Sequence, residues 1–246
     1  MFTELQYRIL KAIAPSVKDH FECSAFEGRS KLKVQLGEDI LNRIQGLRVA
    51  DFGCGEGSEA IEMAQFGAKE VIGIDIQEEL LVVAREKARV AGVDQICRFA
   101  QTTSEPVDCV LSLDAFEHFG DPLAILRAMD RILKPDGIAI ICFGPVWRHP
   151  LGGHLFSVFP WAHLIFSEKA LIRWRSDFKN DGATRIGEVA GGLNQMTISR
   201  FENLIAQSSF RFQTLDLVPI GPLRRIHNRL TREFTTAVVR CQLVKS

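Results

Sequence analysis

The stretch VADFGCGEG, residues 49–57, joins an apolar run to a helix through a loop that contains three glycines. The preceding LRVADF predicts a buried strand, and the following SEAIEMAQFG predicts a helix that ends at Gly67. Glycine lets a backbone approach a ligand where any Cβ would clash, and the N-terminal amides of the helix point at that ligand. The stretch therefore predicts a loop that binds a small molecule.

Two aspartates flank this loop. Asp51 lies within the first strand, and Asp75 ends the second expected strand, EVIGID. A carboxylate at the end of a second strand is placed to accept both hydroxyls of a ribose. Glu56, inside the loop, would oppose a pyrophosphate at close range, whereas a ligand with a free amine suits it. The pattern therefore favours a cationic nucleoside over a dinucleotide.

Strands and helices alternate up to Gly144, which predicts βαβ units and a parallel sheet. Later in the chain, TISRFENLIAQSSF predicts a helix in which Ser199 and Glu202 have capping-box spacing. Further strands are expected at QICRFA (95–100), VDCVLSL (107–113), GIAIICFG (137–144), FRFQTLDLVPI (210–220) and FTTAVVRCQLV (234–244), and further helices at 77–93 and 121–137.

The chain divides into three expected parts. Residues 1–46 would form an N-terminal helical cap, whose amphipathic segments at 4–13 and 31–45 could cover the first strand. Residues 47–246 would form one α/β domain, with an inserted lid or acceptor-binding segment at 145–195, rich in aromatic residues, His, Gly and Pro.

Composition narrows the class of protein. The 30 basic and 30 acidic residues give a formal net charge of +0, so no overall field favours nucleic acid. The six cysteines include no CxxC pair, which argues against a zinc knuckle or a disulfide scaffold. No secretory signal and no run long enough to span a bilayer is evident. We expect a cytoplasmic protein with a small-molecule partner, no nucleic-acid partner and no membrane span.

Four motifs occur in the order typical of one family: DFGCGEG, GIDI, the VDCVLSLDAFEHF block and RILKPDG. Over about residues 47–143 the chain resembles the class I S-adenosylmethionine-dependent methyltransferases, in particular the branch that includes ubiquinone-biosynthesis and other small-molecule methyltransferases. The resemblance implies a Rossmann-like fold with a mostly parallel seven-stranded sheet, helices on both faces and an insertion after strand five. It also implies S-adenosylmethionine as cofactor and S-adenosylhomocysteine as product.

The resemblance implies a set of residues for the methionine part of the cofactor. Asp51 would hold its ammonium, directly or through water. The main chain of the loop would wrap it at Gly53, Cys54, Gly55 and Gly57. We interpret Cys54 as a small loop residue, because methyl transfer needs no thiol nucleophile.

The nucleoside part is assigned in the same way. Asp75 would take the ribose hydroxyls, and Ile76 would pack on the adenine. The adenine amino group would meet Gln101 or Thr102, since the usual aspartate is absent there. Leu113 and Asp114 would lie under the sulfonium, and an alternative for Asp114 is a helix N-cap.

Transfer to a neutral hydroxyl or amine requires a base, whereas a carboxylate acceptor needs none. His118, after the fourth strand, and His154, in the insertion, are the candidate bases, with a structural role as the alternative. Asp114, Glu117 and His118 are similar to the ExxEH run that binds a divalent ion in some ubiquinone-pathway O-methyltransferases. The same EH pair occurs in metal-free relatives, so we expect no metal.

The insertion should determine which acceptor binds. Its aromatic residues either form the core of a small helical cap or line a pocket for a flat or lipid-like acceptor. The candidate acceptor contacts are Trp147, His149, Phe159, Trp161 and His163. The expected activity is methylation of an O or N atom of a small, apolar or aromatic molecule in biosynthesis. Alternatives are methylation of tRNA or protein, and a protein that binds the cofactor without transferring its methyl group.

Overall fold

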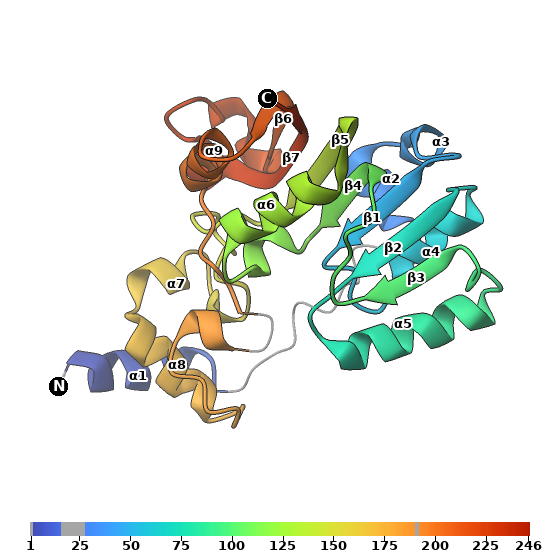
Figure 1. Ribbon diagram of the computed structural model, residues 1–246. Coiled ribbons are helices and arrows are strands. Elements are labelled where there is room, and N and C mark those ends of the chain that lie inside the picture. The colour runs from blue at the N-terminus through green and yellow to red at the C-terminus, as the bar shows by residue number, and fades with distance from the viewer. Residues whose placement is uncertain (1, 16–27, 190–191) are drawn as a thin grey trace.

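The computed structural model describes residues 2–15, 28–189 and 192–246, which form one seven-stranded sheet (Figure 1). The strand order is β3-β2-β1-β4-β5-β7-β6. The strands are β1 (Arg48–Phe52), β2 (Glu70–Ile74), β3 (Cys97–Ala100), β4 (Val107–Leu113), β5 (Leu133–Phe143), β6 (Phe210–Pro219) and β7 (Thr236–Lys245).

The first five strands run parallel, and β7 lies antiparallel between β5 and β6. This confirms the expected mostly parallel, seven-stranded sheet. Chain order reverses at β1, which pairs with β2 on one side and β4 on the other: Asp51 is in register with Gly73 and with Leu111. Such a switch point opens a crevice at the carboxyl ends of the strands, where ligands of open α/β sheets bind.

Helices cover both faces of the sheet, as expected. Alternate residues of a strand face opposite sides, so Val49 and Ala50 of β1 are both fully buried, in different hydrophobic clusters. The face on the Val49 side is covered by α2 (Lys31–Leu36), α3 (Ile40–Arg43), α4 (Ser58–Gln65) and α5 (Glu78–Val90). The face on the Ala50 side is covered by α6 (Pro122–Ile132) and α9 (Ile198–Ala206).

The insertion after β5 and the N-terminal helix form a third hydrophobic cluster, which includes Leu10, Phe156 and Trp174. In Figure 1, α1 (Phe2–Ile13), α7 (Ala162–Ile165) and α8 (Glu168–Ser176) gather beside the sheet. The N-terminal helix therefore packs on α8, so the expectation that residues 4–13 cover the first strand is wrong, whereas α2 and α3 do cover that strand. Residues 16–27 of the expected N-terminal cap lie outside the described residues. No helix in the described ranges is long and apolar enough to cross a bilayer.

Two local predictions are wrong. Strand β5 begins at Leu133 rather than at 137, and its first residues pair with β4 through a register shift. The residue that caps α9 is Thr197, whose side chain accepts a hydrogen bond from the Arg200 amide. Ser199 instead donates to Glu233 of α10 (Arg232–Thr235), because the C-terminal segment brings a buried carboxylate to the start of α9.

Candidate functional site

The glycine loop is fastened to β2, since the amides of Gly53 and Cys54 both donate to the Ile74 carbonyl, at 2.8 and 3.1 Å. The three loop glycines have different roles. A Cβ on Gly53 would lie 2.4 Å from the Ala115 Cβ, and one on Gly57 would lie 2.7 Å from the Phe99 ring. A Cβ on Gly55, where φ is +51°, would meet no described atom within 4 Å. Gly55 therefore marks the open part of the loop.

Cys54 is buried between these glycines, and burial raises the pKa of its thiol. A buried thiol held in its neutral form is a poor nucleophile. The geometry therefore fits a small loop residue.

Asp75 joins the loop to the end of β2. Its Oδ2 accepts from the Gly55 amide at 3.0 Å and its Oδ1 from the Gln77 amide at 2.9 Å. Next to it, the Ile76 side chain is 83% exposed, and Gln101 donates to the Ile76 carbonyl at 3.2 Å. The structure thus brings a half-buried carboxylate and an exposed apolar side chain together at one end of the sheet. Thr102 is exposed beside Gln101.

Asp51 is a buried carboxylate in the middle of the site, with 2% of its surface exposed. Burial, reinforced by the negative charge of Glu59, raises the pKa of Asp51 to about 8. Among the described residues, none donates a hydrogen bond to its Oδ2. A buried acceptor of this kind requires a donor, and a cationic amine would also favour its charged form. The residues present therefore fit the ammonium of S-adenosylmethionine.

Asp114 lies directly after β4, near the buried Leu113, in a left-handed conformation with φ of 46°. Gln35 of α2 donates to both of its oxygens, at 2.9 and 2.8 Å, and Lys31 Nζ lies 3.0 Å from Oδ2. The 3₁₀ turn Phe116–His118 that follows has no side-chain cap, so the N-cap alternative is wrong. Sequence reasoning missed Lys31 and Gln35, whose i, i+4 spacing on a short helix was the available signal.

Glu117 is a second buried carboxyl, and burial raises its pKa to about 8. Its Oε1 accepts from the Gly144 amide at 3.3 Å, whereas Asp114 contacts α2 and the His118 ring faces residue 192. The DAFEH side chains therefore have separate partners. Within the part of the chain that the structure describes, no three His, Cys, Asp or Glu side chains gather as metal ligands.

His118 and His154 come together, with ring centroids 5.6 Å apart in an edge-to-face contact. His118 Nδ1 lies 3.1 Å from the Gly192 carbonyl oxygen, which can only accept. Nδ1 therefore carries the proton, and Nε2 of the neutral ring is left as a proton acceptor. Burial, followed by the nearby His118, lowers the pKa of His154 to about 4, so His154 is neutral near pH 7.

The other candidates in the insertion mostly contact one another. His163 has both ring nitrogens engaged, with Ser157 Oγ at 2.9 Å and the Trp147 carbonyl at 2.6 Å, and Trp147 also packs on its ring. His149 Nδ1 accepts from the Leu151 amide, and burial lowers the pKa of His149 to about 4.

Phe159 and Trp161 also have partners within the insertion. Phe159 packs on Phe166 with centroids 6.0 Å apart, and the Trp161 indole donates to the Arg148 carbonyl at 3.0 Å. The insertion is joined to the end of β4 by a different contact, the one between the His118 and His154 rings.

Comparison with known proteins agrees with this geometry. Residues 50–141, which run from β1 to β5 and contain the loop and both aspartates, match a family model described as a methyltransferase domain. Over residues 50–141 the chain therefore contains the methyltransferase domain that is typical of the class I S-adenosylmethionine-dependent methyltransferases. A curated relative, the ubiquinone biosynthesis O-methyltransferase of Dinoroseobacter shibae, is 34% identical over 170 residues, which are 65% of this chain and 66% of the relative. The chain thus spans just under two thirds of that methyltransferase.

Solved structures share the fold at low identity. The StiE O-MT structure gives a TM-score of 0.56 at 14% identity, over 96% of this chain and 81% of that one. The 4+2 cyclase SpnF gives a TM-score of 0.54 at 14% identity, over 84% of this chain and 79% of that one. Because a cyclase and an O-methyltransferase share this architecture, the fold of the methyltransferase domain does not by itself specify the reaction.

Proposed function

We propose that this methyltransferase transfers the methyl group of S-adenosylmethionine to a hydroxyl oxygen of a small, apolar or aromatic acceptor. The name of the curated relative supports oxygen as the methylated atom. The pairing of His118 with His154, at the junction between the cofactor-binding strands and the insertion, is the observation on which the proposal depends most.

In this proposal the cofactor lies over the ends of β1 and β2, and it supplies a methyl group activated by a sulfonium. Asp51 binds the ammonium, the loop at Gly55 lies against the methionine part, and Asp75 accepts the ribose hydroxyls. The exposed Ile76 packs on the adenine. The loop glycines Gly53 and Gly57 allow the close packing that holds this arrangement.

The remaining cofactor contacts follow the same geometry. Gln101 or Thr102 meets the adenine amino group, and Leu113 with Asp114 lies under the sulfonium. Asp114 is held in place by α2, so its role is to shape the pocket.

The acceptor proton goes to His118. The Gly192 carbonyl fixes the tautomer of this ring, and Nε2 takes the hydroxyl proton as the oxygen–carbon bond forms and the carbon–sulfur bond breaks. His154 packs on the ring and restricts its orientation. The acceptor lies against Trp147, His149, Phe159 and Trp161 in this proposal, whereas His163, with both nitrogens engaged, holds the insertion together.

The experiment is methyl transfer from a labelled donor to a panel of apolar phenols, with wild-type protein and His118→Gln. We expect wild-type protein to label at least one phenol. The variant should lose about 10²- to 10⁴-fold in kcat, with little change in the KM for the cofactor. His227→Gln, whose Nδ1 contacts Thr235, is the matched control and should keep the wild-type rate.

Two results would contradict the proposal. An unchanged kcat in His118→Gln would remove the assigned base. Tight cofactor binding without any labelled product, over acceptors that include phenols, amines, tRNA and protein, would favour a protein that binds S-adenosylmethionine for another purpose.

The proposal includes a cytoplasmic location and no nucleic-acid partner. The balanced charge supports the second statement. The five cysteines within the described ranges are buried free thiols, which suits a reducing compartment.

A further inference from the structure

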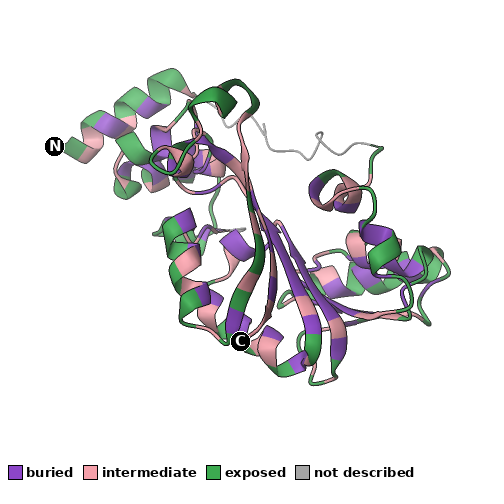
Figure 2. Cartoon of the chain, turned by 90° about the horizontal axis from the view of Figure 1, so that it is seen from above, coloured by how far each residue is buried: buried purple, intermediate pink, exposed green. Residues whose placement is uncertain are grey.

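Asn194, near the end of the insertion, hydrogen-bonds to three carbonyls of the turn that follows β4. Its main-chain amide donates to the Glu117 carbonyl at 2.8 Å. Its side-chain nitrogen donates to the Phe116 and Phe119 carbonyls, at 2.8 and 3.0 Å. Figure 2 shows buried strands at the centre of the molecule, and β4 is one of them. Asn194 therefore ties the end of the insertion to a turn that a buried strand supports.

The turn that Asn194 contacts carries the candidate base, and a neighbour of Asn194 contacts that base. The Gly192 carbonyl oxygen lies 3.1 Å from His118 Nδ1, and Gly192 precedes Asn194 by two positions. His118 is the last residue of the turn Phe116–His118. A shift of residues 192–194 relative to the turn would therefore change the distance between this carbonyl and the ring.

Other contacts hold the same segment, residues 192–196, from its far side. Gly192 packs so closely on the 3₁₀ turn Ile186–Glu188 that a Cβ on it would lie 2.4 Å from the Gly187 carbonyl oxygen. The Met196 carbonyl accepts from the Trp147 amide at 2.7 Å. The segment is therefore fixed near both of its ends, and Asn194 lies between these two points.

The backbone of this segment is constrained at Gln195. This residue has a φ of 58°, in the left-handed region that disfavours residues with a Cβ. Its side chain is exposed, so packing of that side chain does not account for the conformation. The hydrogen bonds of Asn194 and Met196, on either side, do account for it. Constrained backbone of this kind persists where surrounding contacts hold it, and it concentrates at functional sites.

We propose that Asn194 is a positioning residue for methyl transfer: it holds the Gly192 carbonyl against His118 Nδ1 and thereby keeps Nε2 free of a proton. A neutral imidazole carries one proton, and the hydrogen bond that one nitrogen makes decides which nitrogen can act as a base. Without this carbonyl the proton exchanges between the two nitrogens, and only part of the protein has a basic Nε2. The inference rests on the proposed function, in which His118 takes the acceptor proton.

The first test reads the tautomer of His118 and requires no acceptor. Asn194→Asp keeps the shape of the side chain, but a carboxylate only accepts hydrogen bonds and cannot donate to the turn. Nitrogen-15 NMR of histidine-labelled protein at about pH 8.5, where neutral rings prevail, shows which ring nitrogen carries the proton. We expect the proton of His118 on Nδ1 in wild-type protein and on both nitrogens in the variant. The spectrum of His118→Gln identifies the His118 signals.

The second test measures methyl transfer to a phenol that wild-type protein labels. Asn194→Asp should lower kcat about 10²-fold, because misplacement of a catalytic group is costly, and should leave the KM for the cofactor unchanged. Added to His118→Gln, the same substitution should lower kcat by no more than about twofold further, since Asn194 acts through His118. A merely structural residue would not show this dependence on His118.

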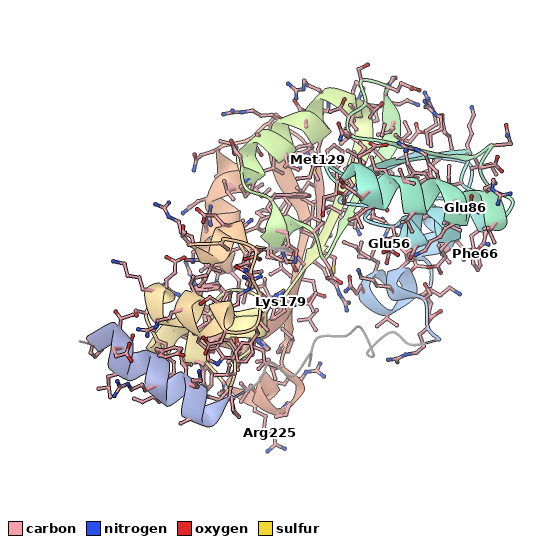
Figure 3. All side chains as sticks on the ribbon, turned by 90° about the horizontal axis from the view of Figure 1, so that it is seen from below. Glu56, Phe66, Glu86, Met129, Lys179 and Arg225 are labelled. Atoms are coloured by element: carbon pink, nitrogen blue, oxygen red, sulfur yellow. The ribbon has the colours of Figure 1, made fainter. Side chains whose placement is uncertain are left out.

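Two further variants serve as controls. Asn180→Asp makes the same chemical change at an exposed residue of the insertion, next to Lys179, which Figure 3 shows apart from Glu56 of the glycine loop. It should keep the wild-type tautomer and the wild-type kcat. Asn194→Ala removes the side-chain donors without adding a charge, and it answers the same questions if the aspartate variant unfolds. Thermal melting establishes which variants are folded.

Three outcomes would overturn the inference. The His118 proton stays on Nδ1 alone in folded Asn194 variants, or wild-type protein does not carry it there. The third is a double variant in which the losses in kcat from Asn194→Asp and His118→Gln multiply, which would show that the two residues act independently. The proposed function fails separately, because wild-type protein that labels no acceptor still gives the tautomer of His118 by NMR.

Discussion

The side-chain nitrogen of Gln35 lies 2.9 and 2.8 Å from the two carboxylate oxygens of Asp114, so α2 is tied to the end of β4 across 79 positions of the sequence. Lys31 strengthens this link from the same helix, at 3.0 Å from Asp114 Oδ2. The N-terminal segment therefore forms one wall of the proposed cofactor site.

Gln35→Met should lower the free energy of unfolding by about 1–3 kcal/mol, because it removes a buried donor to a charged acceptor while keeping the side-chain length. Urea titration measures this, with Gln95→Met, on an exposed loop, as the control. Equal midpoints for the two variants would show that the Gln35 amide contributes nothing to stability.

Asp75→Ala should weaken S-adenosylmethionine binding tenfold or more, because the variant loses the acceptor assigned to the ribose hydroxyls. Isothermal calorimetry measures the affinity. Asp136→Ala, which removes an exposed carboxylate from β5, should leave the affinity unchanged. Undiminished binding by the Asp75 variant would mean that the ribose lies elsewhere.

Gly55→Ala should mainly lower cofactor affinity, whereas Gly57→Ala should mainly lower stability. Both residues have a positive φ, which costs an alanine about 1 kcal/mol. The Gly57 variant adds a clash with the Phe99 ring, so its melting temperature should fall by several degrees more than that of the Gly55 variant.

The Gly55 variant should stay folded and lose cofactor affinity, since its new methyl group points into the space assigned to the ligand. Calorimetry on both proteins, next to their melting curves, makes the comparison. A Gly55 variant with wild-type affinity would contradict the assignment of that space.

Asp51→Asn should flatten the dependence of stability on pH. The pKa of Asp51 is about 8 in the folded protein and returns to about 3.8 on unfolding. Between these two pH values the folded state therefore binds more protons than the unfolded state. Stability of the cofactor-free protein therefore falls as pH rises through this window, by at most a few kcal/mol. Glu117, whose pKa is also about 8, acts in the same direction, so the variant keeps part of the slope.

Urea midpoints at pH 5, 6, 7 and 8 test this prediction. The wild-type midpoint should decline over the series, and the decline should be smaller in the asparagine variant. Parallel curves would show that Asp51 does not titrate in this range.

His163→Ala should destabilise the protein by about 1–3 kcal/mol, because Ser157 and the Trp147 carbonyl both lose a buried partner. His149→Ala, which removes one hydrogen bond, is the comparison and should cost less. Thermal melts check the order. A reversed order would return His163 to the candidate acceptor contacts.

Local patterns in the sequence predicted most of the core fold. The alternation of apolar runs and amphipathic helices identified the five parallel strands, because burial on both faces imposes a continuous apolar run on each strand. The two aspartates were also predicted from local sequence. A loop such as GCGEG, next to strands that end in acidic residues, is compatible with few structures other than a loop that binds a ligand. The prediction of a capping box at Ser199 was wrong because Glu233, from a distant segment, accepts a hydrogen bond from the Ser199 hydroxyl.

By itself, then, the sequence determined the parallel core, the loop after β1 and the placement of Asp51 and Asp75 at neighbouring strand ends. These follow from periodicity and backbone geometry within short segments. Only the tertiary structure decided that Gln35 and Lys31 reach Asp114, that His118 meets His154, and that α1 packs on α8 with Leu5, Ile9 and Ile13 left exposed. Each of these depends on which surfaces meet when distant segments pack, and short-range patterns carry no information about that.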